Sequence, residues 1–253
     1  MTDFSYQLYS SRNFPPLTET LKMLDGLGYA QVEGFGSLYG PGEDPVALRD
    51  ELDANGLTMP TCHMALDVVE NAPTAAIATA RTLGCNAIFV PHITKPDRPS
   101  EAVGWAALGK RLAESGKPIL DSGIKLGWHN HEFEFADLGG TDKPLDLILA
   151  GSDDISLELD LAWVKVSGED PVEWIMKFGS RLVAAHIKDI APDSSAQNED
   201  GWADVGHGVM EWDKITDALR KTSVEYLVME HDNPNDHERF ARRSLAAAQN
   251  FWS

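Results

Sequence analysis

The chain has 253 residues, 43% of them hydrophobic, and a formal net charge of −19 at pH 7. This length matches one (β/α)8 barrel and is too short for two large domains with linkers, so we expect a single domain over residues 1–253. The acidic balance argues against nucleic-acid partners, and the absence of a long apolar run argues against a membrane span. The N-terminal segment lacks the features of a secretory signal, and Cys62 and Cys85 lie in apolar runs, so we expect a cytoplasmic protein with buried thiols.

Short β-rich runs alternate with helical stretches along the whole chain. The expected strands are residues 4–8, 30–33, 59–63, 87–90, 126–131, 155–160, 183–188 and 226–230. The expected helices are residues 17–27, 45–54, 73–83, a longer one opened by Ser100, 171–178, and one from Asp236 to about residue 250. This alternation predicts a parallel α/β architecture, and eight repeats favour a closed barrel over an open doubly wound sheet. Residues 191–210 are the longest irregular stretch and are expected to form an active-site loop.

Polar side chains gather at the C-terminal ends of the last four expected strands. Residues on a strand alternate between two faces, and in a small barrel one face points inward. Barrel active sites lie at the C-terminal ends of the strands, so inward-pointing side chains there are expected to share one site. This set consists of His129, His131, Asp160, His186, Lys188 and Glu230.

Imidazoles and carboxylates that converge in this way suit a divalent cation such as Mn²⁺, Co²⁺, Fe²⁺, Zn²⁺ or Mg²⁺. The set contains no thiolate, which argues against a structural zinc site. A purely structural interpretation is also open, in which Lys188 pairs with Asp189 or Glu230 and Glu158 is a buried partner for Lys188 or another cation. A single histidine such as His63 is more often structural than functional. Polar side chains stand at the C-terminal ends of four strands, and this repetition favours a shared functional site over a structural role.

Five segments carry a resemblance to a known family. They are WHNHEFEF at 128–135, ELDLAWVKVSG at 158–168, AAHIKDI at 184–190, DVGHGVMEWDKI at 204–215 and VMEHD at 228–232. At these segments the sequence resembles the sugar phosphate isomerase/epimerase family, the xylose isomerase-like TIM barrels that include tagatose and psicose epimerases and inosose dehydratase. The resemblance covers nearly the whole chain, and it is poorly specific for substrate.

The resemblance implies a divalent metal, with Mn²⁺ as the preferred candidate. Members of the family usually hold the metal with Glu, Asp, His and Glu at the ends of strands five to eight. The last three positions match Asp160, His186 and Glu230. The first position departs from the pattern, because His129 stands where many relatives have Glu. We favour His129 as the replacement ligand, and Glu134 in the following loop is the alternative.

The resemblance also implies chemistry on a ketose or keto-sugar, by proton abstraction next to a metal-bound carbonyl. Glu230 and His131 would then be the acid/base pair, and Lys188 would bond a substrate hydroxyl or the developing oxyanion. Isomerisation or epimerisation is the favoured reaction, and a lyase or dehydratase acting on a keto-sugar, an inosose or a 3-keto-glycoside is the alternative. The expected substrate-binding residues are Tyr6, His63, Glu134, Trp163, Trp202 and His207.

No phosphate-binding motif is evident, so a non-phosphorylated sugar, cyclitol or glycoside is expected as the small-molecule partner. The family fold includes a branch of DNA-repair endonucleases, which the net charge disfavours here. The sequence leaves open whether the chain forms a homo-oligomer.

Overall fold

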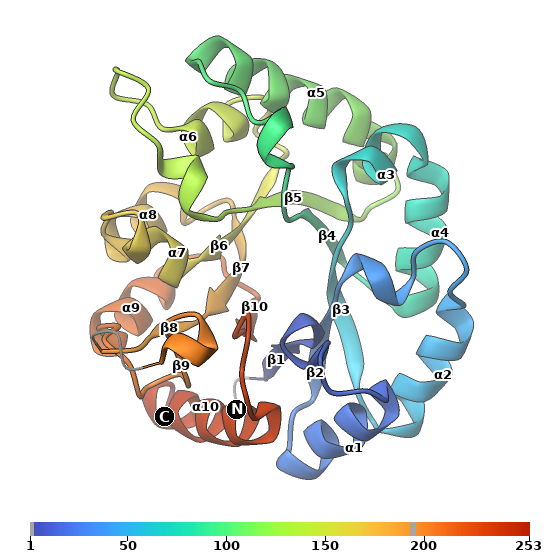
Figure 1. The fold of residues 1–253 in the computed structure, drawn as a ribbon. Coiled ribbons are helices and arrows are strands. Elements are labelled where there is room, and N and C mark those ends of the chain that lie inside the picture. Colours follow the sequence, from blue (N-terminus) through green and yellow to red (C-terminus); the bar gives the residue numbers. More distant parts are fainter. Residues whose placement is uncertain (1–2, 193–195) are drawn as a thin grey trace.

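A computed structural model describes residues 3–192 and 196–253. Eight parallel strands form a closed barrel in the order β1-β10-β7-β6-β5-β4-β3-β2, with helices around its outside (Figure 1). The closed barrel confirms the predicted fold and excludes the open sheet. The barrel strands are β1 (Phe4–Gln7), β2 (Gln31–Gly34), β3 (Thr58–His63), β4 (Ala87–Val90), β5 (Lys125–His129), β6 (Ser156–Asp160), β7 (Leu182–Ile187) and β10 (Tyr226–Met229).

The helices form the outer layer. They are α1 (Leu17–Leu27), α2 (Pro45–Ala54), α3 (Leu66–Asn71), α4 (Pro73–Leu83), α5 (Ala102–Asp121), α6 (Pro144–Leu149), α7 (Leu161–Val166), α8 (Pro171–Phe178), α9 (Trp212–Leu219) and α10 (His237–Phe251). The predicted ranges 17–27, 45–54, 73–83 and 171–178 are confirmed, whereas α3, α6, α7 and α9 were not predicted. Asp170 caps α8 by accepting the Val172 N–H, and Pro171 takes the first helical position. Glu101 stands at the N-cap position of the long helix α5 and makes no side-chain capping hydrogen bond, so the prediction that Ser100 opens the helix was wrong by one residue.

The interior of the barrel is apolar at one end and polar at the other. Ala87, Phe89, Val183 and Ala184 form the apolar cluster. Gly127 on β5 leaves room for the Phe89 ring, because a Cβ there would lie 2.6 Å from a ring carbon. The polar residues lie toward the C-terminal ends of several strands, and on β7 His186 follows Val183 and Ala184. The sequence therefore builds an apolar floor beneath a polar site.

The loop predicted over residues 191–210 is partly regular, and residues 193–195 of it lie outside the described residues. A short hairpin pairs β8 (Asp189–Ile190) with β9 (Trp202–Ala203), and it brings Trp202 back over the barrel mouth. The carboxylate of Asp189 organises the turn that follows. It accepts hydrogen bonds from the backbone N–H groups of Gly206, Gly208 and Met210 and from the indole N–H of Trp212. The suggested pairing of Lys188 with Asp189 was therefore wrong, because the Asp189 oxygens accept hydrogen bonds from the loop.

Two further expectations can be compared with the described residues. None of the helices in residues 3–192 and 196–253 has the length and hydropathy needed to cross a membrane. Cys62 and Cys85 are both buried free thiols, as their apolar surroundings in the sequence predict.

Candidate active site

Four buried side chains from β5, β6, β7 and the end of β10 meet at the polar end of the barrel. Each offers one ligand atom, and these atoms all lie within 4.8 Å of one another. The register of the sheet brings them together, since Asp160 lies beside His186 across β6 and β7. We call this set, His129, Asp160, His186 and Glu230, the strand-end group. It is the same set that the sequence proposes as metal ligands, and ligation itself stays a prediction.

Asp160 ends β6 and begins α7, and its two carboxylate oxygens face different surroundings. Oδ1 caps α7 by accepting the backbone N–H groups of Ala162 and Trp163, both at 2.9 Å. Oδ2 is buried without a hydrogen bond among the described residues, 3.6 Å from Lys188 Nζ and 3.8 Å from His186 Nδ1. Burial raises the pKa of Asp160 to about 7. A buried carboxylate oxygen without a hydrogen bond is unfavourable, and a cation is one partner that would satisfy it.

Lys188 lies directly above Asp160 and is fully buried. Its Nζ is 2.5 Å from Asp232 Oδ2 and 3.3 Å from Glu230 Oε2. It also lies over two indole rings, 4.2 Å from the centroid of Trp202 and 5.0 Å from that of Trp163. Burial opposes the charged amine, but Asp232, Glu230 and Asp160 raise the pKa of Lys188 above its ordinary value, so the amine is positively charged. Pairing with Glu230 was foreseen from the sequence, and pairing with Asp232 was missed.

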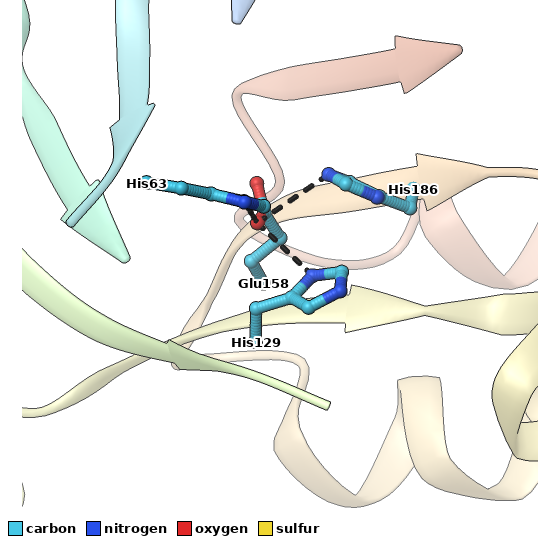
Figure 2. A group of neighbouring side chains, drawn as sticks. All are labelled: His63, His129, Glu158 and His186. Carbon is cyan, nitrogen blue, oxygen red and sulfur yellow. Dashed lines mark hydrogen bonds and ion pairs between the residues drawn. The ribbon is translucent and has the colours of Figure 1, made fainter. Parts of the chain in front are cut away.

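A second cluster lies deeper in the barrel, and the sequence interpretation did not recognise it as a unit. Figure 2 shows three imidazoles, those of His63, His129 and His186, gathered around the carboxylate of Glu158. The distances from Glu158 Oε2 are 2.6 Å to His63 Nε2, 3.1 Å to His129 Nδ1 and 3.4 Å to His186 Nε2. We call these four residues the inner group. Among the described residues Glu158 forms no ion pair with Lys188, so that half of the suggestion was wrong. Burial alone would lower the pKa of His63, but Glu33 and Glu158 raise it to about 10, so the alternative of another cationic partner for Glu158 fits His63.

Glu33 adds a further carboxylate beside the inner group. Its Oε1 lies 2.8 Å from His186 Nε2 and 3.2 Å from His63 Nε2, and it accepts a hydrogen bond from Gln7 Nε2. Nothing in the local sequence marks Glu33, because it sits in an early strand far from the late-strand motifs. Alternation of faces along β2 is the signal that could have found it.

The donor chemistry of this region, with carboxylates and imidazoles buried together, fits a divalent cation. Glu33, Glu158, Asp160 and Glu230 are all buried, and among the described residues Lys188 is the only lysine or arginine in an ion pair with any of them. Burial alone would lower the pKa of His186, but the carboxylates of Glu158 and Glu230 raise it well above its ordinary value. Buried charge needs compensation, and nitrogen and oxygen donors of this kind are suitable ligands for Mn²⁺, Co²⁺ or Zn²⁺. The residues present therefore fit a metal at the strand-end group.

A cavity of about 390 Å³ opens over both groups. This volume is in the range usual for small-molecule sites. The lining residues are Tyr9, Phe35, Gly36, His63, Pro91, His92, His129, His131, Glu230 and Asp232. His131 follows the end of β5, and its Nδ1 is buried without a hydrogen bond among the described residues. Burial and the charge of Lys188 lower the pKa of His131 to about 3, so the imidazole is neutral.

Three of the expected substrate-binding residues lie elsewhere. Tyr6 is fully buried, bonds Ser11 through its hydroxyl and packs on Tyr29 and Phe240, so it belongs to the layer between barrel and helices. His207 is exposed on the turn after β9 and lines a separate surface hollow. The assignments of Tyr6 and His207 to the substrate site were wrong. Tyr6 points to the other face of its strand, and the turn carries His207 away from the cavity.

Glu134 is the third, and its carboxylate is used by the local turn. Its oxygens accept the indole N–H of Trp128 at 3.0 Å and the backbone N–H of His131 at 2.8 Å. Burial raises its pKa to about 8. Glu134 belongs to neither candidate ligand group and does not line the cavity. The expectation that Glu134 contacts the substrate is therefore corrected, because its carboxylate shapes the turn that carries His131. Of the two candidates for first ligand, His129 is the better placed.

Alanine variants of His129 and Glu134 should separate the two candidates for first ligand. His129→Ala is expected to weaken Mn²⁺ binding by about tenfold or more, since it removes a donor from the strand-end group. Glu134→Ala is expected to leave Mn²⁺ affinity within about threefold while lowering stability by roughly 1–3 kcal/mol, because two buried donors lose their acceptor. Isothermal titration with Mn²⁺ and urea unfolding of the metal-free proteins give both quantities. The reverse order of affinities would make Glu134 the ligand.

Comparison with known proteins agrees with the barrel. A model of the xylose isomerase-like TIM barrel family matches residues 26–251. The rhizopine catabolism protein MocC of Rhizobium meliloti is 25% identical over 168 residues, 56% of this chain and 51% of MocC. An inosose dehydratase of Clostridium botulinum (strain Alaska E43 / Type E3) is 30% identical over 99 residues, 38% of this chain and 32% of that enzyme. The matches thus span about half or less of these relatives.

Among solved structures, a sugar phosphate isomerase/epimerase from Parabacteroides distasonis ATCC 8503 superposes with a TM-score of 0.80 at 20% identity. That match covers 100% of this chain and 96% of the other. At this identity the likeness is one of fold.

Proposed function

Since this chain belongs to the xylose isomerase-like TIM barrel family, we propose that it is a divalent-metal-dependent isomerase or epimerase of a keto-sugar. The observation that carries the proposal is the convergence of the strand-end group beside a cavity lined by His131 and Glu230. The fold that the chain shares with a sugar phosphate isomerase/epimerase is compatible with this reaction class. The substrate we propose is a non-phosphorylated sugar or cyclitol.

The proposed ligands of the metal are His129, Asp160, His186 and Glu230, with Mn²⁺ as the preferred ion. When bound, the ion would act as a Lewis acid toward a substrate carbonyl and so acidify the neighbouring C–H. The side chains of this protein would transfer the proton and stabilise the developing charge. The preference for Mn²⁺ comes from the family resemblance, and a donor set that mixes imidazole nitrogen with carboxylate oxygen is compatible with it.

Proton transfer is assigned to Glu230 and His131, which line the same cavity from different strands. His131 follows β5 and Glu230 follows β10, and β6 and β7 separate these strands in the barrel. One group removes the proton from the carbon next to the carbonyl and the other returns a proton on the opposite face, which inverts that centre. Lys188, held between Asp232, Glu230 and Asp160, can donate to the oxygen on which negative charge develops.

The sugar itself would bind against the aromatic walls of the cavity. Tyr9 and Phe35 line it and contact each other edge to face, with ring centroids 5.4 Å apart. Trp163 lies 5.6 Å from the His131 ring, and its indole N–H has no hydrogen-bond partner among the described residues. A donor of this kind near the site is suited to a substrate hydroxyl. His63 lines the same cavity and is the remaining expected contact.

A lyase or dehydratase is the second candidate, and His131 is the observation that favours it. An acid/base pair made of an imidazole and a carboxylate can remove a proton and protonate a leaving group, which eliminates water or an aglycone. Similarity to an inosose dehydratase supports this alternative. Its substrate would be a keto-sugar, an inosose or a 3-keto-glycoside.

Metal analysis and exchange in D2O test the proposal. The purified protein is expected to hold about one divalent ion per chain, and the Mn²⁺-loaded protein is offered non-phosphorylated ketoses, inososes and 3-keto-glycosides. Proton NMR should show deuterium entering the recovered sugar if the enzyme is an isomerase or epimerase. Loss of water or an aglycone would favour the lyase. A protein that binds no added Mn²⁺ and turns over none of these compounds would contradict both.

A further inference from the structure

We propose that Glu33 is a positioning residue that fixes which nitrogen of His186 faces the metal. The inference rests on the proposed metal site and adds a residue outside the ligand set. Glu33 lies on β2, across the barrel from His186 on β7. Its carboxylate is fully buried and contacts Nε2 of His186.

The two nitrogens of His186 face opposite partners. Nε2 lies 2.8 Å from Glu33 Oε1, and Nδ1 lies 2.9 Å from Glu230 Oε2 and 3.8 Å from Asp160 Oδ2. An ionised carboxylate only accepts hydrogen bonds, so the contact with Glu33 requires that Nε2 carries the hydrogen. Glu230 Oε2 calls for a hydrogen on Nδ1 in the same way while no ion is bound. When an ion takes Nδ1 and Glu230 as ligands, only the contact with Glu33 would still need an N–H, so the hydrogen would stay on Nε2 and the lone pair of Nδ1 would face the ion. Glu33 therefore selects the tautomer that can bind an ion there.

Glu33 is itself held in place. Gln7 on β1 donates from Nε2 to Glu33 Oε1 at 2.8 Å, and His63 Nε2 lies 3.2 Å from the same oxygen. The amide of Gln7 also accepts the backbone N–H of Tyr9, which fixes its orientation. A chain of contacts thus runs from the backbone after β1 through Gln7 and Glu33 to His186. Supporting carboxylates of this kind hold a histidine ligand in orientation and increase its basicity.

The same geometry decides between the two candidate metal positions. The inner group would use His186 Nε2, 3.4 Å from Glu158 Oε2, whereas the strand-end group would use Nδ1. A neutral imidazole has one lone pair, so it serves one position at a time. Nδ1 is held by Glu230, which is itself a proposed ligand, whereas Nε2 is held by Glu33, which belongs to neither candidate group. An ion at the strand-end group keeps both contacts useful, so we place the ion there. Glu33 and Glu158 then accept hydrogen bonds from histidines behind the site.

Two substitutions of Glu33 test the inference through metal affinity. All three polar contacts of Glu33 reach Oε1, and Oε2 has no hydrogen bond among the described residues. In Glu33→Gln the amide oxygen can take the place of Oε1, which keeps the geometry but removes the charge. We expect Mn²⁺ affinity to fall about tenfold in Glu33→Gln and up to about 100-fold in Glu33→Ala. Titration against a competing chelator measures this.

Asp204→Asn is the matched control, because Asp204 is a buried carboxylate paired with Arg239 and Arg243 outside the site. It should keep the wild-type Mn²⁺ affinity. In the Zn²⁺-loaded proteins, long-range ¹⁵N NMR is expected to show the hydrogen of His186 on Nε2 in the wild type and a changed pattern in Glu33→Ala. A purely structural role would lower the melting temperature of the metal-free protein and leave both the affinity and the tautomer unchanged.

Each other outcome overturns the inference in a recognisable way. Unchanged affinity in both Glu33 variants removes the positioning role and leaves the proposed function intact. If His63→Ala abolishes binding while Asp160→Asn does not, the ion sits in the inner group and His186 uses Nε2. If the wild type binds no metal at all, the proposed function fails together with this inference.

Discussion

Asp160→Asn is expected to weaken Mn²⁺ binding by about 100-fold or more, roughly 2.7 kcal/mol, while the chain stays folded. The reason lies in the different surroundings of its two oxygens. Oδ1 accepts the N–H groups of Ala162 and Trp163 and so caps α7. An asparagine must turn its carbonyl oxygen toward these donors to keep the cap, since asparagine caps helices as well as aspartate does. Its NH2 group then points at the ion in place of Oδ2, and a donor cannot serve as a ligand.

Asp170→Asn provides the matched control. Asp170 caps α8 by accepting the Val172 N–H at 2.9 Å, and it lies outside both candidate ligand groups. The two variants make the same chemical change at a helix N-terminus, so their thermal stabilities should fall by similarly small amounts. Only the Asp160 variant should lose metal affinity. Equal Mn²⁺ affinity in the two variants, measured by titration calorimetry, would remove Asp160 from the proposed ligands.

The pleat of the late strands carries most of what the sequence predicts about the site. Alternation along β6 places Glu158 and Asp160 on the inner face, and the corresponding positions on β7 and after β10 are His186 and Glu230. In a parallel barrel these strand ends meet in one place whatever the details of register. Local pattern is therefore enough to predict that the four side chains of the strand-end group come together.

Contacts between strands that are far apart in the sequence cannot be predicted from the local pattern of residues. Glu33 and Gln7 reach His186 only because β1 and β2 close the barrel, and nothing near them in the sequence resembles a ligand motif. The wrong assignment of Tyr6 has the same origin. Its strand holds few residues that mark the inner face, and the structure shows that Gln7 contacts the site and Tyr6 contacts the helices. One residue along a strand exchanges the two faces.

Loops that follow the strands are harder still to place. His207 and Trp202 belong to the same irregular segment, yet Trp202 lies over Lys188 and His207 is exposed on the outside. Their positions depend on the hairpin of β8 with β9 and on the hydrogen bonds that Asp189 accepts from the turn. These interactions link backbone groups about twenty residues apart. Residue type alone carries no signal for them, so composition could not separate the two side chains.

Glu230→Gln and His131→Ala are each expected to lower net conversion of the substrate by about 10²- to 10⁴-fold in both directions of the reaction, while proton exchange persists for only one epimer in each variant. If the two groups act from opposite faces, each variant retains the base for one epimer and lacks it for the other. With each epimer offered separately in D2O, His131→Ala should still exchange the proton of one epimer, and Glu230→Gln that of the other. Both are measured at saturating Mn²⁺, because Glu230 is also a proposed ligand.

His207→Ala is the control for these variants, since His207 is an exposed imidazole outside the cavity and its loss should leave conversion unchanged. The pattern of exchange also separates the two reaction classes. In an epimerase the proton removed is replaced on the same carbon, so one-sided exchange persists when one partner is missing. In a lyase, an enzyme that lacks its acid exchanges the proton without releasing water or an aglycone, and an enzyme that lacks its base does neither. Wild-type conversion in both variants would show that neither His131 nor Glu230 transfers the proton.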